Sequence, residues 1–429
     1  MIPQPKFSIL IPTTGRADLA AMSVNSILKQ DLQDFEIIIV DSGADERGLS
    51  DIIPKDQRIS YFNVNQNSKG HPLLPWDFAA RKARGEYIMW QDDDNYLLPF
   101  SLKLFNDAIE KTRADIITAS QFYYYDKYHP RHALKNSLGI IPFTQKKYFV
   151  EPMDLAESML SFSKRGADVP LPRFHSSATM VSKKIIDQAF LKLGFVILTD
   201  TPISHSVNLI TLALAQTCFV IDLPVSIVGR LGRSMSQIWS TAARARFKRE
   251  EFKRKESPVT GHTKINAILE NYLEVKKLLP EKLASVEVDY ARFAELYMQE
   301  LFYLDADFGM MIKNWQNFFL FIKTLDPEKQ KELGKKAKKL MLLAAFVFLS
   351  RRLKLHFLKR FTYEKLKGTG NAQANAKKIT GNKEFEISLE SYKINSVEDL
   401  ATKLNKIMLQ KTNFDMSALN LSVDLPSTK

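Results

Sequence analysis

Residues 87–96 read YIMWQDDDNY, an apolar run followed at once by three aspartates. Neighbouring carboxylates raise each other's pKa, so the group costs free energy unless a positive charge lies among them. A run of aspartates is most often a solvated loop. Here, however, the residues after Glu86 are typical of a buried strand, and a helical spacing of apolar residues follows Pro99. We therefore predict the aspartates at the carboxyl end of a central strand, where open α/β sheets bind ligands.

The composition indicates a globular protein with more than one domain. The chain has 429 residues, of which 45% are hydrophobic and 25% charged. A single cysteine, Cys218, excludes an internal disulfide framework and is typical of a reducing compartment. The amino terminus lacks a secretory signal pattern, and no apolar run reaches the roughly 20 residues that span a bilayer. We expect a cytoplasmic protein.

The positive charge is concentrated in the second half of the chain. The formal net charge is +13, and residues 241–429 hold 35 basic and 23 acidic residues, a net +12 that leaves +1 for residues 1–240. Residues 331–380 alone carry 14 basic and 2 acidic residues. The basicity therefore belongs to one carboxyl-terminal segment.

The first half alternates short β-branched runs with helical stretches, a pattern that predicts an α/β fold with a mostly parallel sheet and crossover helices. The predicted strands are 6–13, 35–42, 59–64, 86–91, 114–124, 176–182, 195–200 and 218–229. The predicted helices are 17–29, 76–84, 183–193 and 203–217. Residues 126–175 are predicted to be a long, partly ordered insertion over the sheet.

Long amphipathic helices follow residue 240 and predict a mainly helical second unit. The expected organisation is an α/β domain over 1–240, a helical domain over 241–367 that contains the basic and apolar segment 335–360, and a linker with a small tail over 368–429.

Four stretches of the first half carry a resemblance to a known family. They are FSILIPTTGR (7–16), SVNSILKQDLQDFEIIIVDSGADE (23–46), WDFAARKARGEYIMWQDDDNYLLP (76–99) and GFVILTDTPISHSVNLITLALAQTCFVIDLPVSIVGR (194–230). Their order and spacing are similar to those of the family 2 glycosyltransferases, which are inverting enzymes of the GT-A fold that use nucleotide-sugar donors. The resemblance covers about residues 5–240.

The resemblance implies a donor site around the first two strands. Asp41 matches the family's base-binding aspartate and is suited to accept the imide N–H of uracil, although a turn aspartate is the structural alternative. The other residues expected near the donor nucleotide are Thr13, Thr14, Arg16, Asp77, Asp92, Asp93, Arg230 and Arg233. Arg230 and Arg233 belong to the loop GRLGRS (229–234), which could contact a diphosphate or be a solvated basic loop.

The aspartate run matches the Asp-x-Asp motif of the family. Asp92 and Asp94 are the expected metal ligands, with Asp92 toward the ribose, while Asp93 could take either part because the register is uncertain by one residue. Mn²⁺ or Mg²⁺ prefers such oxygen ligands. Asn95 stands where the family often has a further acid.

Asp200 is the expected catalytic base, because an inverting transfer needs a carboxylate that accepts the proton of the attacking hydroxyl. A helix cap is the structural alternative for this residue. Thr199 replaces one member of the acid pair that the family often shows. The family's Gln-x-x-Arg-Trp motif is absent from residues 236–240, so we expect one sugar to be added per encounter.

Segment 335–360 places the apolar run Leu340 to Leu349 between two basic clusters. It could lie on an anionic membrane as a peripheral helix, pack as a core helix, or bind nucleic acid, which is the least favoured because aromatic residues are sparse there.

These features predict a metal-dependent glycosyltransferase that moves one sugar, from a UDP-sugar in preference to other donors, to a hydroxyl of a glycan or lipid-linked acceptor. Polysaccharide or cell-envelope synthesis and peripheral contact with the inner membrane face fit this prediction. Two alternatives stay open, a catalytically silent binding or scaffold protein and a sugar-phosphate nucleotidyltransferase.

Overall fold

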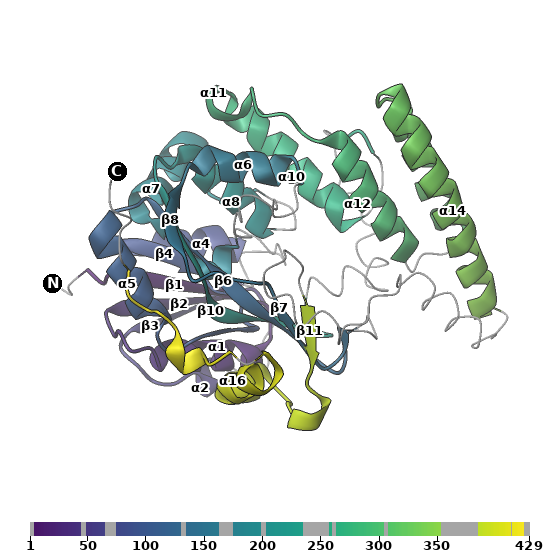
Figure 1. Cartoon of the computed structure of the whole chain (residues 1–429). Coiled ribbons are helices and arrows are strands. Elements are labelled where there is room, and N and C mark those ends of the chain that lie inside the picture. The colour runs from purple at the N-terminus through teal and green to yellow at the C-terminus, as the bar shows by residue number, and fades with distance from the viewer. Residues whose placement is uncertain are drawn as a thin grey trace.

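The computed structural model describes most of the chain (Figure 1). The described residues are 4–43, 49–64, 74–129, 134–162, 175–198, 203–234, 257–259, 263–303, 308–352, 385–412 and 414–423.

One mixed sheet forms the centre of the protein. Its strands are β1 (Phe7–Thr13), β2 (Phe35–Asp41), β3 (Ile59–Asn63), β4 (Tyr87–Trp90), β5 (Asn95–Leu97), β6 (Ile116–Tyr125), β7 (Ser137–Ile140), β8 (Lys147–Val150), β9 (Thr179–Ser182), β10 (Cys218–Arg230) and β11 (Phe385–Ser388). The main path runs β11-β7-β6-β9-β4-β1-β2-β3, and β10 pairs with β5, β6 and β8. Strands β3, β2, β1 and β4 are parallel, whereas β9 pairs antiparallel with both β4 and β6.

Helices cover both faces of the sheet. They are α1 (Ala17–Leu28), α2 (Leu49–Ile52), α4 (Leu74–Lys82), α5 (Ser101–Thr112), α6 (Pro152–Leu160), α7 (Lys183–Leu193) and α8 (Ile203–Leu214), with the 3₁₀ turn η2 (Ser176–Ala178) before β9. The apolar sides of α1 and α5 pack on one face, and those of α4, α6, α7 and α8 pack on the other. Because both faces are covered, β1 and β2 are buried along their whole length and consist largely of apolar residues.

A helical unit follows the sheet. Its helices are α10 (Lys264–Leu278), α11 (Pro280–Leu283), α12 (Tyr290–Tyr303), α13 (Phe308–Ile322) and α14 (Pro327–Arg352). Helices α12, α13 and α14 share a core that includes Phe293, Tyr297, Trp315 and Phe318. Tyr272 of α10 belongs to the core under α4 and α8, so α10 packs against the sheet domain. In Figure 1, α14 lies at the outer edge of the molecule. No described helix is long and apolar enough to cross a membrane.

The carboxyl-terminal tail returns to the sheet. Strand β11 pairs antiparallel with β7, and the tail continues with η5 (Glu390–Tyr392), α16 (Val397–Thr412) and η6 (Met416–Ala418). Leu400 and Leu404 of α16 pack with Phe122 and Tyr124 of β6. The described tail therefore extends the core of the first half.

The predicted fold class, an α/β sheet with crossover helices followed by a helical region, is confirmed. Two local predictions are wrong. Residues 126–175 are not simply an insertion over the sheet, because β7 and β8 are strands of it and α6 packs on it. Residues 195–198 form no strand, since the N–H groups of Val196 and Leu198 donate to the side chains of Asp77 and Ser206 instead of a neighbouring strand.

Candidate functional site

Strands β2, β1 and β4 lie side by side and end at the same edge of the sheet. Asp41 is the last residue of β2, Thr13 is the last residue of β1, and the three aspartates follow β4 after Gln91. The sheet topology therefore brings Asp41 close to the aspartates of 92–94, which follow it by 51 to 53 positions in the sequence.

The loop from Thr13 to Arg16 contacts both groups of acids. Thr13 Oγ1 donates to Oδ2 of Asp93 at 2.6 Å, and Gly15 N donates to Oδ1 of Asp41 at 3.1 Å. Thr14 Oγ1 lies 3.0 Å from the hydroxyl oxygen of Ser42. The loop needs Gly15 for its positive φ of 61°. These four residues join the expected base pocket to the aspartate cluster.

Asp41 is fully buried and holds the loops after β1 and β2. Its Oδ1 accepts the N–H groups of Gly15 at 3.1 Å and Gly43 at 2.7 Å, and the hydroxyl of Tyr61 lies 3.4 Å from Oδ2. A Cβ atom at Gly43 would lie 2.3 Å from Gly15 N, so the two loops meet at a contact that only glycine allows. Among the described residues, no backbone N–H donates to Oδ2 of Asp41.

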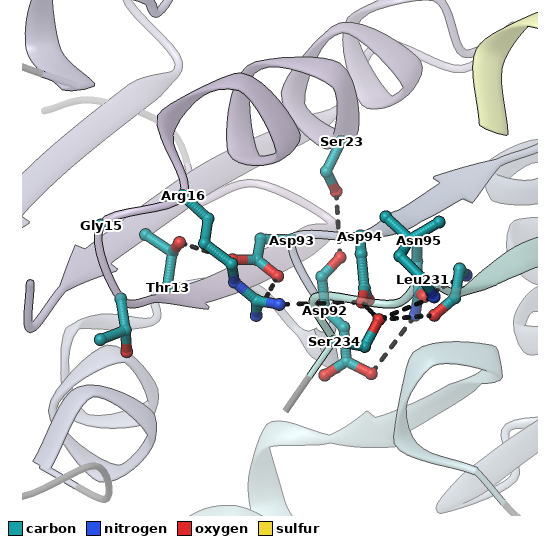
Figure 2. A network of polar contacts seen from close by, with 12 residues as sticks. Thr13, Gly15, Arg16, Ser23, Asp92, Asp93, Asp94, Asn95, Leu231 and Ser234 are labelled. Atoms are coloured by element: carbon teal, nitrogen blue, oxygen red, sulfur yellow. Dashed lines mark hydrogen bonds and ion pairs between the residues drawn. The ribbon is translucent and has the colours of Figure 1, made fainter. Parts of the chain in front are cut away.

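Asp93 is fully buried, and Figure 2 shows its contacts with Thr13 and Arg16. Besides the bond from Thr13, Arg16 Nη2 lies 2.5 Å from its Oδ1. Burial raises the pKa of Asp93 to about 7, the Arg16 charge opposes this shift, and Asp94 adds to it. Asp93 therefore contacts the loop between β1 and α1.

Asp92 and Asp94 take contacts from η2 and from the loop after β10. Ser177 Oγ donates to Asp92 Oδ2 at 3.2 Å, and Asn95 Nδ2 lies 3.4 Å from the same oxygen. Ser234 Oγ donates to Asp94 Oδ2 at 2.6 Å, while Arg16 Nη1 lies 3.8 Å away. Burial raises the pKa of Asp92 to about 6, with a further rise from Asp94, and the charges of Arg230 and Arg16 oppose it.

The loop after β10 closes against the aspartates. Gly229 N donates to the Asp94 carbonyl oxygen at 3.1 Å, and a Cβ atom at Gly229 would lie 2.3 Å from that oxygen. The Arg230 guanidinium lies 5.1 Å from the centre of the Tyr123 ring. Arg233 instead forms an ion pair with Asp18 on the surface of α1, with about half of its side chain exposed. Of the two arginines predicted here, Arg230 is the one whose charge lowers the pKa of Asp92.

Asp77 lies in the first turn of α4. Its Oδ1 accepts the N–H of Val196 at 3.1 Å, and burial raises its pKa to about 6. The side chain therefore holds the segment that leads toward residue 200. Asp200 itself and Thr199 lie outside the described residues, so the predicted base stays a prediction.

The residues present fit a divalent cation that is shared with a substrate. No group of three His, Cys, Asp or Glu side chains among the described residues is placed to hold a metal ion alone. Asp92 and Asp94 supply two carboxylates, and Mg²⁺ or Mn²⁺ in phosphate-transfer sites is often held by one or two carboxylates together with substrate phosphates. The cost of burying these acids gives a second reason to expect a cation here.

Sequence reasoning missed two hydroxyl groups of this site. Ser177 and Ser234 donate to Asp92 and Asp94, and they come from η2 and from the loop after β10. Serines carry little signal of their own, because the residue type is common in loops. Their roles depend on long-range pairing between strands far apart in the sequence.

Comparison with known proteins identifies the sheet domain. Residues 8–169 match the glycosyl transferase family 2 model. The GalNAc(5)-diNAcBac-PP-undecaprenol beta-1,3-glucosyltransferase of Campylobacter jejuni is 38% identical over 101 residues, which are 23% of this chain and 32% of that protein. The poly(ribitol-phosphate) beta-N-acetylglucosaminyltransferase TarS of Staphylococcus aureus is 28% identical over 116 residues, which are 26% of this chain and 20% of that protein.

The chain thus spans a third or less of the length of these two curated relatives. The crystal structure of S. aureus TarS 1-349 in complex with UDP-GlcNAc has 15% sequence identity and a TM-score of 0.46, with 81% of this chain and 92% of that chain covered. The family match lies on the same strands and loops that carry Asp41 and the aspartate cluster. Residues 8–169 of the sheet domain are thus similar to the family 2 glycosyltransferases.

Proposed function

We propose that the protein is an inverting glycosyltransferase that moves one sugar from a UDP-sugar to a hydroxyl of a glycan or a lipid-linked acceptor. The observation that carries the proposal is the loop Thr13–Arg16, which contacts Asp41 on one side and the aspartate cluster on the other. A nucleoside diphosphate has a base at one end and phosphates at the other. A site that joins a base acceptor to a phosphate-side cation site fits this shape.

In this proposal the base end of the donor lies at Asp41. Its Oδ2, which takes no backbone donor within the described part of the chain, would accept the imide N–H of uracil, while Oδ1 keeps the loops in place. The TarS structure is a complex with UDP-GlcNAc, and a UDP-sugar donor for this chain is consistent with that. Thr14 and Ser42 lie beside this position and complete the polar edge of the pocket.

Asp92 and Asp94 would hold Mn²⁺ or Mg²⁺ at the phosphate end. When bound, the cation would act as a Lewis acid that stabilises the charge developing on the departing diphosphate. Ser177 and Ser234 orient the two carboxylates, because each hydroxyl donates to one of them. Arg230 would add positive charge on the same side as Asp92.

Asp200 is proposed as the base that accepts the proton of the acceptor hydroxyl. The residues just before it are anchored, since Val196 donates to Asp77 and Leu198 donates to Ser206. The Campylobacter relative is named for an undecaprenol-linked substrate, and this favours a lipid-linked acceptor as the first class to test.

The proposal includes peripheral contact with an anionic membrane at its cytoplasmic face. Along α14, Lys331, Lys335, Lys338, Lys339 and Leu342 are exposed and recur at helical spacing. The ion pairs recorded on this helix involve Lys329, Glu332 and Lys336 instead. A stripe of lysines that ends in an exposed leucine fits the headgroup region of an anionic bilayer.

A donor panel tests the proposal. UDP-, GDP- and dTDP-sugars are supplied with Mn²⁺ or EDTA, and nucleoside diphosphate release is measured for the wild type, Asp94→Ala and Asp200→Ala. We expect UDP release that needs the cation and is lost in both variants, while Asp200→Ala still binds the donor. Donor binding without release in the presence of lipid-linked and glycan acceptors would favour the silent binding protein, and binding of no nucleotide sugar would refute the proposal.

A further inference from the structure

Arg16 is the cation that contacts Asp93 and Asp94 among the described residues. Three adjacent carboxylates, opposed by Arg16 and by the charge of Arg230 near Asp92, leave an excess of negative charge in a poorly solvated place. Arg16 lies closer to Asp93 than to Asp94, because its Nη2 is 2.5 Å from Asp93 Oδ1 whereas its Nη1 is 3.8 Å from Asp94 Oδ2. The contact with Asp93 is a direct ion pair, and the contact with Asp94 is looser.

The guanidinium also has unused donors. Arg16 Nε and Nη1 are buried and have no hydrogen-bond partner among the described residues. Only 22% of the side chain is exposed. Buried donors without acceptors cost free energy, and they indicate a place where an acceptor belongs. Phosphate oxygens suit a guanidinium well, because two parallel N–H groups can bind one phosphate.

The position of Arg16 limits how far it can move. It stands directly before α1 in the loop whose other members are held by Asp93, Ser42 and Asp41. The backbone is therefore fixed, and a change of partner must come from rotation of the side chain. Such a rotation can release the looser contact with Asp94 while the contact with Asp93 is kept.

We propose that Arg16 is the resident counter-cation of the aspartate cluster and that it exchanges partners when the donor binds. This inference rests on the proposed function. Arg16 keeps Asp93, gives up Asp94 to a divalent cation, and offers Nε and Nη1 to the diphosphate. It is thus a positioning residue that competes with the cation in the free protein and cooperates with it once the nucleotide is present.

This role predicts effects of opposite sign for two ligands. Without the Arg16 charge, the cluster is more negative, so it should bind Mn²⁺ alone more tightly. Without the guanidinium donors, the diphosphate loses contacts, so UDP should bind more weakly in saturating Mn²⁺. If Arg16 served folding alone, its substitution would weaken the binding of both Mn²⁺ and UDP.

The test is a titration of Mn²⁺ without nucleotide, followed by a titration of UDP in saturating Mn²⁺. The proteins are the wild type, Arg16→Gln and Arg16→Lys, with Arg58→Gln as a control because Arg58 pairs with Asp56 far from the cluster. For Arg16→Gln we expect Mn²⁺ affinity to rise about tenfold and UDP affinity to fall about tenfold, which is about 1.4 kcal/mol each. Arg16→Lys keeps the charge, so it should resemble the wild type for Mn²⁺ and lose affinity for UDP.

Equal or weaker Mn²⁺ binding by Arg16→Gln would overturn the inference, and so would absence of Mn²⁺ binding in both proteins. If Arg16→Gln fails to fold by circular dichroism, Arg16→Lys decides the question, since unchanged UDP affinity in that variant would also contradict it. The Mn²⁺ titration needs no sugar transfer. A protein that shows the expected Mn²⁺ effect but turns over no donor would therefore refute the proposed function and leave the counter-cation role supported.

Discussion

Thr13 donates a 2.6 Å hydrogen bond to Asp93, and both side chains are almost completely buried. This bond joins the end of β1 to the turn after β4, across the boundary between two neighbouring strands of the sheet. Replacement of Thr13 by valine keeps the shape of the side chain and removes the donor. The Asp93 carboxyl would then be buried with one partner fewer.

We expect Thr13→Val to lower the free energy of unfolding by about 1 to 3 kcal/mol, the usual cost of leaving a buried polar group without its partner. Urea denaturation measures this change. Thr14→Val is the matched control, because Thr14 is exposed and its hydroxyl meets Ser42 rather than a buried acid. An equal loss of unfolding free energy in the two variants would contradict a stabilising role for the hydrogen bond from Thr13 to Asp93.

Gly43 sets how closely the loops after β1 and β2 approach. A Cβ atom there would lie 2.3 Å from Gly15 N and 2.7 Å from Gly15 Cα, so Gly43→Ala must push the loops apart. We expect the free energy of unfolding to fall by about 1 to 3 kcal/mol. We also expect weaker UDP binding, because moving the loops apart distorts the hydrogen bonds that Gly15 N and Gly43 N donate to Asp41.

Calorimetry with UDP and thermal denaturation measure the two effects. Gly334→Ala in α14 is the control, since its Cβ would meet its nearest neighbour at an ordinary 3.7 Å. Unchanged UDP affinity in Gly43→Ala would mean that Asp41 is not part of the nucleotide site.

Asp77 should make stability depend on pH. Burial raises its pKa to about 6 from an ordinary value of 3.8, so between these values the unfolded chain has released the proton that the folded protein keeps. Rising pH through this window therefore favours unfolding. Asp77→Asn imitates the protonated acid and keeps an oxygen for the Val196 N–H.

We expect wild type and Asp77→Asn to be similarly stable near pH 4, and the variant to be more stable by about 1 to 3 kcal/mol above pH 7. Chemical denaturation at several pH values follows the difference. A stability difference that does not change with pH would mean that Asp77 is not held in its protonated form by the fold.

The lysine stripe of α14 predicts binding to anionic vesicles. Replacement of Lys331, Lys335, Lys338 and Lys339 by alanine should weaken binding to phosphatidylglycerol vesicles at least tenfold, because each basic residue near such a surface contributes about 1 kcal/mol. The control replaces Lys55, Lys103, Lys135 and Lys184, four exposed lysines of the first half.

Vesicle co-sedimentation at low and high salt measures the effect. Equal losses in the two quadruple variants would contradict a specific surface on α14. Tighter binding to nucleic acid or to a soluble polyanion than to vesicles would assign the stripe to another partner.

The sequence predicts the centre of this fold well and its edges less well. Strands β1, β2 and β4 are nearly continuous apolar runs with polar residues at or just after their ends, and this local pattern places Asp41 and the aspartate cluster at one edge of the sheet. Strand β5 is only three residues long and depends on pairing with β10, so it leaves no periodic signal. The apolar run Val196–Leu198 is buried without being a strand, because its N–H groups are bound by side chains.

The contacts within the site could not be read from local patterns. The pairing of Arg16 with Asp93, and of Ser234 with Asp94, joins residues 77 and 140 positions apart. The sequence predicts Arg16 near the donor only through the family resemblance. Which oxygen of the cluster it meets depends on the packing of β1 against β4, which local sequence does not encode.

The most direct test of the account is UDP binding measured by calorimetry with Mn²⁺ and with EDTA, in the wild type, Asp41→Asn and Asp94→Asn. The account predicts that the wild type binds UDP, that EDTA or Asp94→Asn weakens binding at least tenfold through loss of the cation, and that Asp41→Asn weakens it with the cation still present. UDP affinity that is the same in all three proteins and indifferent to EDTA would contradict a nucleotide site spanning Asp41 and the aspartate cluster.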